Sequence, residues 1–356
     1  MVNLADKELE YLISFTTDIH FLRALLGLID MQNEQNKFST PSFEVGNSIS
    51  EDLSRLLVLE RDQKNSYIEA VFQALKEDQV VLVKNLNPNE ADGLMSSIAE
   101  RLGVLNSLKL QAGFASSLGH RENIGTYYMS VNKRTDYQFV APHSEGSSFT
   151  NMQLASFYCY ENSTDGGETI LMNIDQSCEI WEELREKVKR GKTEKILTPS
   201  DIRKIKVLAR LDMPEDTLRD TDEILTESEV MPGVKEFDVL AKPRKTYSHL
   251  LGKEVNVYWN SIESIDSDSA EQFNCFLRAI KLLKLPASDL QVEQLDDIAD
   301  CRLRHFGSRY DQLFKNKITH KLQPGDFIIL NNLSWCHSVN NWTPGSGVRK
   351  VSAAFA

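Results

Sequence analysis

The sequence has no long apolar run and no excess of basic charge. No apolar stretch approaches the roughly 20 residues that a membrane-spanning helix needs. The first residues also lack the basic and apolar regions of a secretory signal. Acidic residues outnumber basic ones by 52 to 40, which gives a formal net charge of -12. The composition therefore argues against a membrane protein, and against nucleic acid or an anionic membrane as the main partner.

Cysteine is scarce and irregularly placed. The number of cysteines is odd, and their spacing resembles neither a disulfide framework nor a zinc site: Cys159, Cys178, Cys275, Cys301 and Cys336. We therefore expect a reducing, cytoplasmic location. Internal repeats and low-complexity tracts are also lacking. At 356 residues, with 41% hydrophobic and 26% charged residues, the chain is typical of a soluble globular protein with a substantial core.

The first third of the chain favours helices. Apolar residues recur at helical spacing over residues 7–31, and a link containing Ser, Thr, Pro and Gly follows. We expect a helical N-terminal extension over residues 1–64. A helix that begins near Ser66 and another over 89–102 should follow, the latter ending at Gly103.

From about residue 105 the pattern changes to strands. Alternating or β-branched segments between turn residues predict strands at 136–141, 152–160, 168–174, 318–322, 327–331 and 349–355. One earlier strand is predicted at 79–84, between two of the helices. Further helices are expected at 177–190 and 268–284. Paired strands on either side of a long insertion favour a mainly β fold with helical decoration. We predict a double-stranded β-helix, or jelly roll, forming a single domain over residues 65–356.

A charged, proline-punctuated segment over residues 196–246 is the predicted insertion. Two interpretations stay open for it. It is either a lid over a binding site, a common role for long excursions from a rigid scaffold, or a solvated loop with no role.

The segment Pro142-His143-Ser144-Glu145 carries the strongest functional signal. Residues two apart in a strand point to the same side, so His143 and Glu145 can reach one metal ion. His337 would complete a set of two histidines and one carboxylate, which suits non-haem Fe(II) oxygen chemistry. The alternative is a surface histidine beside a solvated glutamate. His305 and His320 are rival ligands, but both precede the Pro324-Gly325-Asp326 turn, and we interpret them as structural.

Arg349 is the second informative residue. In the last strand it shares a face with Val351, Ala353 and Phe355, an apolar set that should point inward. A buried guanidinium is unfavourable unless an anion pairs with it, and a carboxylate can accept two parallel hydrogen bonds from it. That carboxylate belongs either to a bound ligand or to a protein Asp or Glu.

Together these segments resemble the taurine dioxygenase and clavaminate synthase superfamily of Fe(II)/2-oxoglutarate oxygenases. The resemblance covers about residues 65–356. It rests on segments that occur in the family's order: Val80 to Leu86, His143-Ser144-Glu145, Asp165-Gly166-Gly167-Glu168-Thr169, Pro324 to Asn332, His337 and Arg349.

The resemblance implies a role for five side chains. His143, Glu145 and His337 would bind Fe(II), while Arg349 and Thr169 would hold the far carboxylate of 2-oxoglutarate. Thr169 is otherwise an ordinary β-branched strand residue. A glutamate at 145 is similar to the clavaminate synthase variant, and a carboxylate there argues against the related halogenases. Ser338-Val339 follows His337 where relatives often have Gly-Arg, which leaves the substrate contacts open.

The implied reaction uses dioxygen and the decarboxylation of 2-oxoglutarate to oxidise a C–H bond of a small substrate. Hydroxylation is the default outcome, and desaturation or ring closure are variants of it. We expect an amino-acid-like substrate from specialised metabolism. Two alternatives remain: a cupin-like metalloenzyme that does not use 2-oxoglutarate, and a non-catalytic jelly-roll binding protein. The sequence does not indicate the oligomeric state.

Overall fold

The computed structural model describes residues 50–61, 67–118, 121–131, 140–194, 196–259, 262–263, 310–339, 342 and 345–356. The expected helices at 7–31 and 268–284 lie outside these ranges. Within the described ranges, no helix is both long and apolar enough to cross a membrane.

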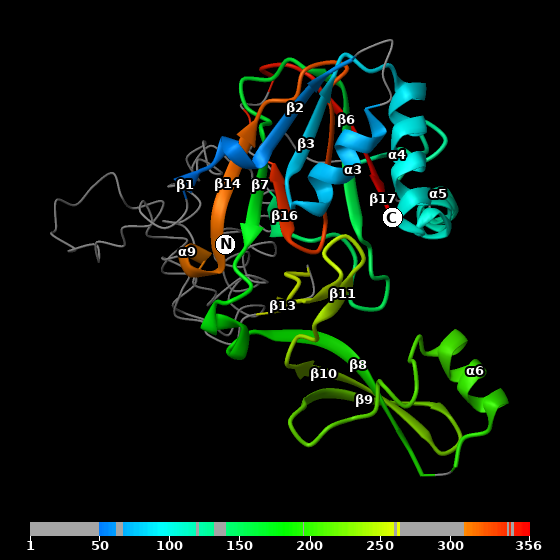
Figure 1. The fold of residues 1–356 in the computed structure, drawn as a ribbon. Coiled ribbons are helices and arrows are strands. Elements are labelled where there is room, and N and C mark those ends of the chain that lie inside the picture. The colour runs from blue at the N-terminus through cyan, green and yellow to red at the C-terminus, as the bar shows by residue number, and fades with distance from the viewer. Residues whose placement is uncertain are drawn as a thin grey trace, which may run out of the picture.

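Two β-sheets form the centre of the molecule (Figure 1). The first has the order β1-β14-β7-β16-β5, with strands β1 (Ser50–Glu51), β14 (Phe314–His320), β7 (Thr169–Ile174), β16 (Trp335–Val339) and β5 (Val140–His143). The second has the order β2-β3-β15-β6-β17-β4, with strands β2 (Leu56–Glu60), β3 (Val80–Lys84), β15 (Phe327–Asn331), β6 (Leu154–Asn162), β17 (Arg349–Phe355) and β4 (Met129–Ser130).

The chain passes back and forth between these sheets. Strands β5, β6 and β7 alternate between the first and second sheets, and β14 to β17 do the same after a long insertion. This alternation defines a double-stranded β-helix, so the predicted jelly roll is confirmed. Apolar side chains from both sheets fill the space between them, among them Leu82, Phe157, Leu171, Ile328 and Phe355.

Helices cover the outer face of the second sheet. They are α3 (Ile68–Lys76), α4 (Pro88–Leu102) and α5 (Leu105–Leu118), and their apolar faces pack against β3, β6 and β15 (Figure 1). Helix α4 begins with a capping box, because the Asn87 side chain accepts from Glu90 N–H and the Glu90 carboxylate accepts from Asn87 N–H. It ends at Gly103, whose φ of 79° is left-handed, as the sequence predicts.

Three local expectations differ from the structure. Residues 50–60, assigned above to a helical extension, form β1 and β2, which pair with β14 and β3 in the core sheets. The segment after residue 105 begins with helix α5 rather than a strand. The helix expected at 177–190 is instead the short 3-10 helix η3 (Glu179–Glu182) followed by strand β8 (Arg185–Thr193).

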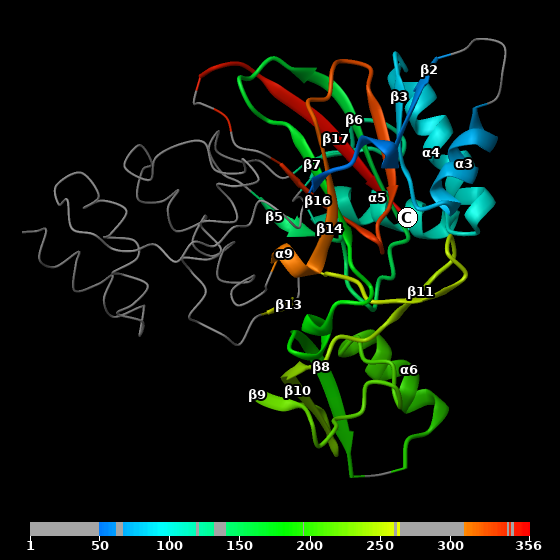
Figure 2. The same ribbon diagram turned by 60° about the vertical axis from the view of Figure 1, so that its left-hand side comes forward.

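The insertion between β7 and β14 is larger than the predicted 196–246. Its described part forms a lobe that projects from the jelly roll (Figures 1 and 2). The lobe contains β8, α6 (Pro199–Leu208), β9 (Glu223–Met231) and β10 (Val234–Ala241), with β8 also pairing with β13 (Ile262–Glu263). Its strands enclose small apolar clusters of their own, separate from the jelly-roll core.

The lobe also buries a charged residue. Arg190 of β8 is almost fully enclosed and pairs with Asp222 at 3.2 Å and Asp216 at 3.5 Å. Arg244 also pairs with Asp216. These pairs satisfy the buried guanidinium and tie the loop after α6 to the strands. The chain then returns to the jelly roll through the hairpin of β11 (Thr246–Ser248) and β12 (Lys253–Val255), and re-enters β14 through the short helix α9 (Tyr310–Leu313).

Candidate metal centre

Strand pairing brings the two histidines together. Strand β16 lies between β7 and β5, and His337 of β16 is the direct partner of His143 at the end of β5. Residues directly opposite each other on antiparallel strands have neighbouring side chains. The imidazole rings are accordingly 4.5 Å apart, centroid to centroid. The register of this one strand pair thus brings together two residues that are 194 positions apart in the sequence.

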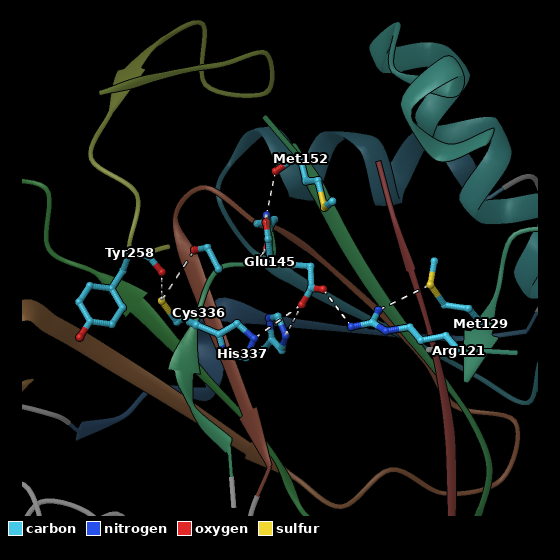
Figure 3. A network of polar contacts seen from close by, with 10 residues as sticks. Arg121, Met129, Glu145, Met152, Tyr258, Cys336 and His337 are labelled. Carbon is cyan, nitrogen blue, oxygen red and sulfur yellow. Dashed lines mark hydrogen bonds and ion pairs between the residues drawn. The ribbon is translucent and has the colours of Figure 1, made fainter. Parts of the chain in front are cut away.

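Glu145 completes the cluster from just beyond β5 (Figure 3). Its Oε2 lies 3.6 Å from Nε2 of His143 and 3.7 Å from Nε2 of His337. One ligand atom from each of the three residues lies within 4.8 Å of the others. Metal–ligand bonds of about 2.0–2.2 Å at right angles place neighbouring donors about 3 Å apart, so a small contraction suffices. Two imidazoles and one carboxylate therefore fit a divalent first-row metal ion.

The backbone of Glu145 is held by Asn332. The Asn332 side-chain oxygen accepts from Glu145 N–H at 2.9 Å. Its amide nitrogen donates to the Glu145 carbonyl at 2.9 Å and to the Met152 carbonyl at 2.8 Å (Figure 3). Asn332 is fully buried, so the clamp is protected from water. Asn332, in the turn between β15 and β16, thus fixes the segment that follows β5.

The carboxylate of Glu145 has a second partner in Arg121. The Arg121 guanidinium donates to Glu145 Oε1 at 3.1 Å (Figure 3). Burial alone would raise the pKa of Glu145, but the hydrogen bond with His143 and the charge of Arg121 outweigh it and lower that pKa to about 2. Glu145 is therefore ionised, which is the form that binds a metal.

Arg349 contacts the turn between β6 and β7, which leads into Thr169. The Nε of Arg349 donates to the carbonyl of Gly167 at 3.1 Å. Gly167 has a φ of 71°, and a Cβ there would lie 2.8 Å from the Arg349 side chain, so only glycine fits easily. Thr169, buried at the start of β7, follows two residues later.

Thr169 lies on the same face of β7 as Leu171. Leu171 is opposite His337 and packs in the core between the sheets. The ring of His337 faces the same space, 5.0 Å from Phe157 and 6.3 Å from Phe355. Two residues along a strand correspond to about 7 Å. Thr169 is therefore about 7 Å along β7 from the position opposite His337, on the same inner surface.

The rival ligand His320 does not join this cluster. His320 lies 3.2 Å from Asp326, whose carboxylate also accepts from the backbone of Gln323. This pairing supports the turn before β15. His305 lies outside the described residues. Asn332 ends one of the family-like segments, but nothing in the sequence assigns it a role at Glu145. Arg121 was missed, because it stands at no spacing that relates it to Glu145.

Comparison with solved structures finds similar chains at low sequence identity, among them the following. AAD-2, solved with Mn(II) and N-oxalylglycine, is 13% identical, with 84% of this chain and 90% of that chain covered and a TM-score of 0.36. PvcB, an Fe, alpha-ketoglutarate dependent oxygenase from an isonitrile synthetic pathway, is 10% identical over 84% and 85%, with a TM-score of 0.34. PvcB from Pseudomonas aeruginosa is 11% identical over the same shares, with a TM-score of 0.37. These TM-scores are too low to carry an argument, and no curated protein matches the chain.

A known protein family does match most of the chain. The family described as taurine catabolism dioxygenase TauD, TfdA family matches residues 50–353. This range spans both sheets of the jelly roll, the insertion and the whole cluster of His143, Glu145 and His337. The chain therefore belongs to the TauD/TfdA dioxygenase family.

Proposed function

We propose that His143, Glu145 and His337 hold the iron of this Fe(II)- and 2-oxoglutarate-dependent dioxygenase, and that Arg349 and Thr169 bind the far carboxylate of 2-oxoglutarate. The observation that carries the proposal is the convergence of three donor atoms within 4.8 Å of one another. The chain belongs to a dioxygenase family that uses 2-oxoglutarate. This membership argues against both alternatives, a cupin-like enzyme without this cosubstrate and a non-catalytic binding protein.

The metal assignment rests on residue chemistry. Three protein ligands on one side of an octahedral ion leave three positions for other molecules. The two imidazoles come from paired strands, and the carboxylate is ionised and clamped through Asn332. The protein therefore holds the donor atoms close together before the ion binds, so the side chains lose less conformational freedom on binding.

The cosubstrate assignment rests on distance and charge. Thr169 is about 7 Å along β7 from the position opposite His337, close to the length of a five-carbon dicarboxylate. Arg349 contacts the carbonyl of Gly167, two residues before Thr169. A guanidinium and a hydroxyl at this end can each donate hydrogen bonds to one carboxylate. The other end of 2-oxoglutarate would then lie at the metal.

Bound iron and 2-oxoglutarate supply the oxidising chemistry, in which dioxygen is consumed and succinate and carbon dioxide are released. The chain's own part is to orient the reactants and to exclude water from the space between the sheets. We propose oxidation of a C–H bond, with hydroxylation as the default. We also propose a small, amino-acid-like substrate of specialised metabolism, since no second arginine follows Arg349 to bind a further anionic group, and a cytoplasmic location.

The proposal can be tested without knowing the substrate. Anaerobic protein is titrated with Fe(II) and then with 2-oxoglutarate, and the metal-to-ligand charge-transfer band is followed. One iron per chain is expected, with the band lost in His337→Ala. His320→Ala is the matched control, because His320 pairs with Asp326 outside the cluster. Wild-type protein that binds iron but gives no band with 2-oxoglutarate would refute the proposal. Screening amino acids for succinate release then identifies the substrate.

A further inference from the structure

Arg121 contacts several groups around the candidate metal centre. Its guanidinium donates to Glu145 Oε1 at 3.1 Å and lies 3.6 Å from the sulfur of Met129 (Figure 3). It also sits over the ring of Phe355, 5.5 Å from the ring centroid. The Arg121 and Glu145 side chains are only 21% and 20% exposed. The pair is therefore less screened by solvent than an ion pair on the open surface.

The two oxygens of Glu145 face different groups. Oε2 faces the histidines, at 3.6 Å and 3.7 Å from their Nε2 atoms. Oε1 points to the opposite side, where Arg121 holds it. One oxygen is thus directed toward the metal position, and the other is occupied by a hydrogen bond to a charged donor. Such bonds are among the stronger ones in proteins.

We propose that Arg121 is a positioning residue that keeps Glu145 a ligand through one oxygen only. This inference rests on the proposed function. His143, Glu145 and His337 would hold the ion and leave the rest of its ligand positions to 2-oxoglutarate and dioxygen. A carboxylate that turned both oxygens to the ion would compete with those molecules. By holding Oε1 away, Arg121 would prevent this competition.

The scaffold fixes Arg121 in place. The residue stands at the base of the loop 121–131, where Ser130 N–H donates to the Glu122 carbonyl at 2.7 Å. At the other end of the loop, β4 pairs with β17 beside Phe355. The loop tip is held by Asp92 of α4.

The Asp92 anchor uses both carboxylate oxygens. They accept from Thr126 N–H at 2.8 Å and from Tyr127 N–H at 2.9 Å. Gly125 comes so close to this carboxylate that a side chain there would collide with it. The loop is therefore tied to α4 at its tip and to β17 at its base, and the guanidinium reaches Glu145 from a braced segment.

The test compares Arg121→Met and Arg121→Lys with a matched control. Arg101→Met removes an arginine with the same kinds of partner, the carboxylate of Glu69 and the ring of Phe72, on helix α4. Each variant is titrated anaerobically with Fe(II) and then with 2-oxoglutarate, with no turnover required. Circular dichroism and thermal unfolding check that each variant folds.

Arg121→Met should still bind one Fe(II). Its charge-transfer band should move, and half-saturation should require about ten-fold or more 2-oxoglutarate, the usual range for losing a group that orients a metal ligand. Arg121→Lys should fall between Arg121→Met and wild type, because one ammonium replaces only part of the guanidinium contacts. Arg101→Met should titrate like wild type.

Two results would overturn the proposal. One is a wild-type iron spectrum and 2-oxoglutarate titration in Arg121→Met. The other is a change confined to the KM of an identified substrate, which would make Arg121 a substrate-binding residue. If Arg121→Met does not fold, Arg121→Lys decides by the same criteria. Failure of the wild-type protein to bind Fe(II) and 2-oxoglutarate would reject the proposed function itself, and it is detected before any variant is made.

Discussion

Arg349 and its neighbour Lys350 have similar charges but different surroundings. Arg349 is partly buried and donates to the Gly167 carbonyl, whereas Lys350 is exposed and lies over the ring of Tyr160 at 5.3 Å. The contact with Gly167 uses only the Nε of the guanidinium. A carboxylate of a bound ligand could accept two parallel hydrogen bonds from the guanidinium.

We predict that Arg349→Ala weakens 2-oxoglutarate binding by about 2–5 kcal/mol, the range for truncating one partner of a buried charge pair. Arg349→Lys should recover only part of this loss, since an ammonium cannot make two parallel hydrogen bonds. The measurement is the anaerobic 2-oxoglutarate titration of the Fe(II) protein. Lys350→Ala is the control and should titrate normally. An Arg349→Ala protein that folds, binds iron and titrates like wild type would disprove the cosubstrate role.

At the residue scale, the two-residue spacing of His143 and Glu145 is what suggests a shared metal in the sequence. The structure brings these two side chains and His337 together, although Glu145 lies just beyond the end of β5. Asn332 and Arg121 could not be found in this way. Asn332 acts through the backbone of a residue 187 positions away, and Arg121 reaches Glu145 from a loop 24 positions earlier. Such contacts depend on how the sheets and helices pack, and no local pattern encodes them.

At the scale of elements, Asp175 joins the end of β7 to the segment before η3. Its Oδ1 accepts from the backbone and hydroxyl of Ser177 at 2.8 Å and 2.7 Å, and from Lys315 of β14 at 2.8 Å. Partial burial by itself raises the pKa of Asp175. The bonds from Lys315 and Ser177 outweigh this effect, so the net pKa lies below its ordinary value.

Because the folded-state pKa of Asp175 is lowered, the stabilisation that this carboxylate contributes depends on pH. The stabilisation by Asp175 is complete above the unfolded-state pKa of about 3.9 and is lost as the pH falls through the lower folded-state value. We predict that Asp175→Asn lowers the free energy of unfolding by about 1 kcal/mol at neutral pH. The difference from wild type should shrink below about pH 4. Denaturant unfolding at several pH values measures it.

The exposed Asp220 provides the control. Asp220→Asn should show little effect at any pH, because exposed carboxylates contribute little to stability. A difference between wild type and Asp175→Asn that stays constant from neutral pH down to about pH 3 would contradict the linkage.

The sequence predicts helices and strands correctly where the local pattern of apolar residues or caps is strong. Strands at 327–331 and 349–355 and the helix ending at Gly103 agree with the structure, because apolar alternation or clear capping marks them. The segment 177–190 was predicted wrongly. Trp181, Leu184 and Val188 match helical spacing, but β8 pairs with β10 along its length. Pairing with a distant strand overrode a weak local preference.

At the scale of the whole molecule, the lobe and the metal centre share connections. After leaving the lobe, the chain passes beside the ligand segment, where Ser144 N–H donates to the Tyr258 carbonyl at 2.8 Å. The buried side chain of Gln153 binds the Tyr247 carbonyl at 3.0 Å and the His249 N–H at 2.9 Å. Ser144 stands between two of the predicted ligands. These hydrogen bonds therefore connect the segment that leaves the lobe with residues near the candidate metal centre.

The jelly roll could be predicted from the sequence because motif order and turns define its alternating strands. The lobe could not. Its sheet joins β8, β10 and β9 from both sides of α6, and its strand β9 is largely exposed and does not alternate apolar with polar residues. The lobe's small apolar clusters stand apart from the main core. Few buried contacts predict that it opens at a lower free energy than the jelly roll.

Hydrogen exchange distinguishes the two interpretations of residues 196–246. Without ligands, the described amides of the lobe should exchange faster than those of β6 and β15, which lie in the centre of the second sheet. If the lobe is a lid, adding Fe(II), 2-oxoglutarate and an identified substrate under anaerobic conditions should slow exchange across 196–246 and across 247–259, which connects the lobe to Ser144. Exchange in β6 and β15 should stay slow throughout and serves as the internal control. Slowing confined to the ligand strands, with 196–246 unchanged, would mean that the lobe is a passive excursion.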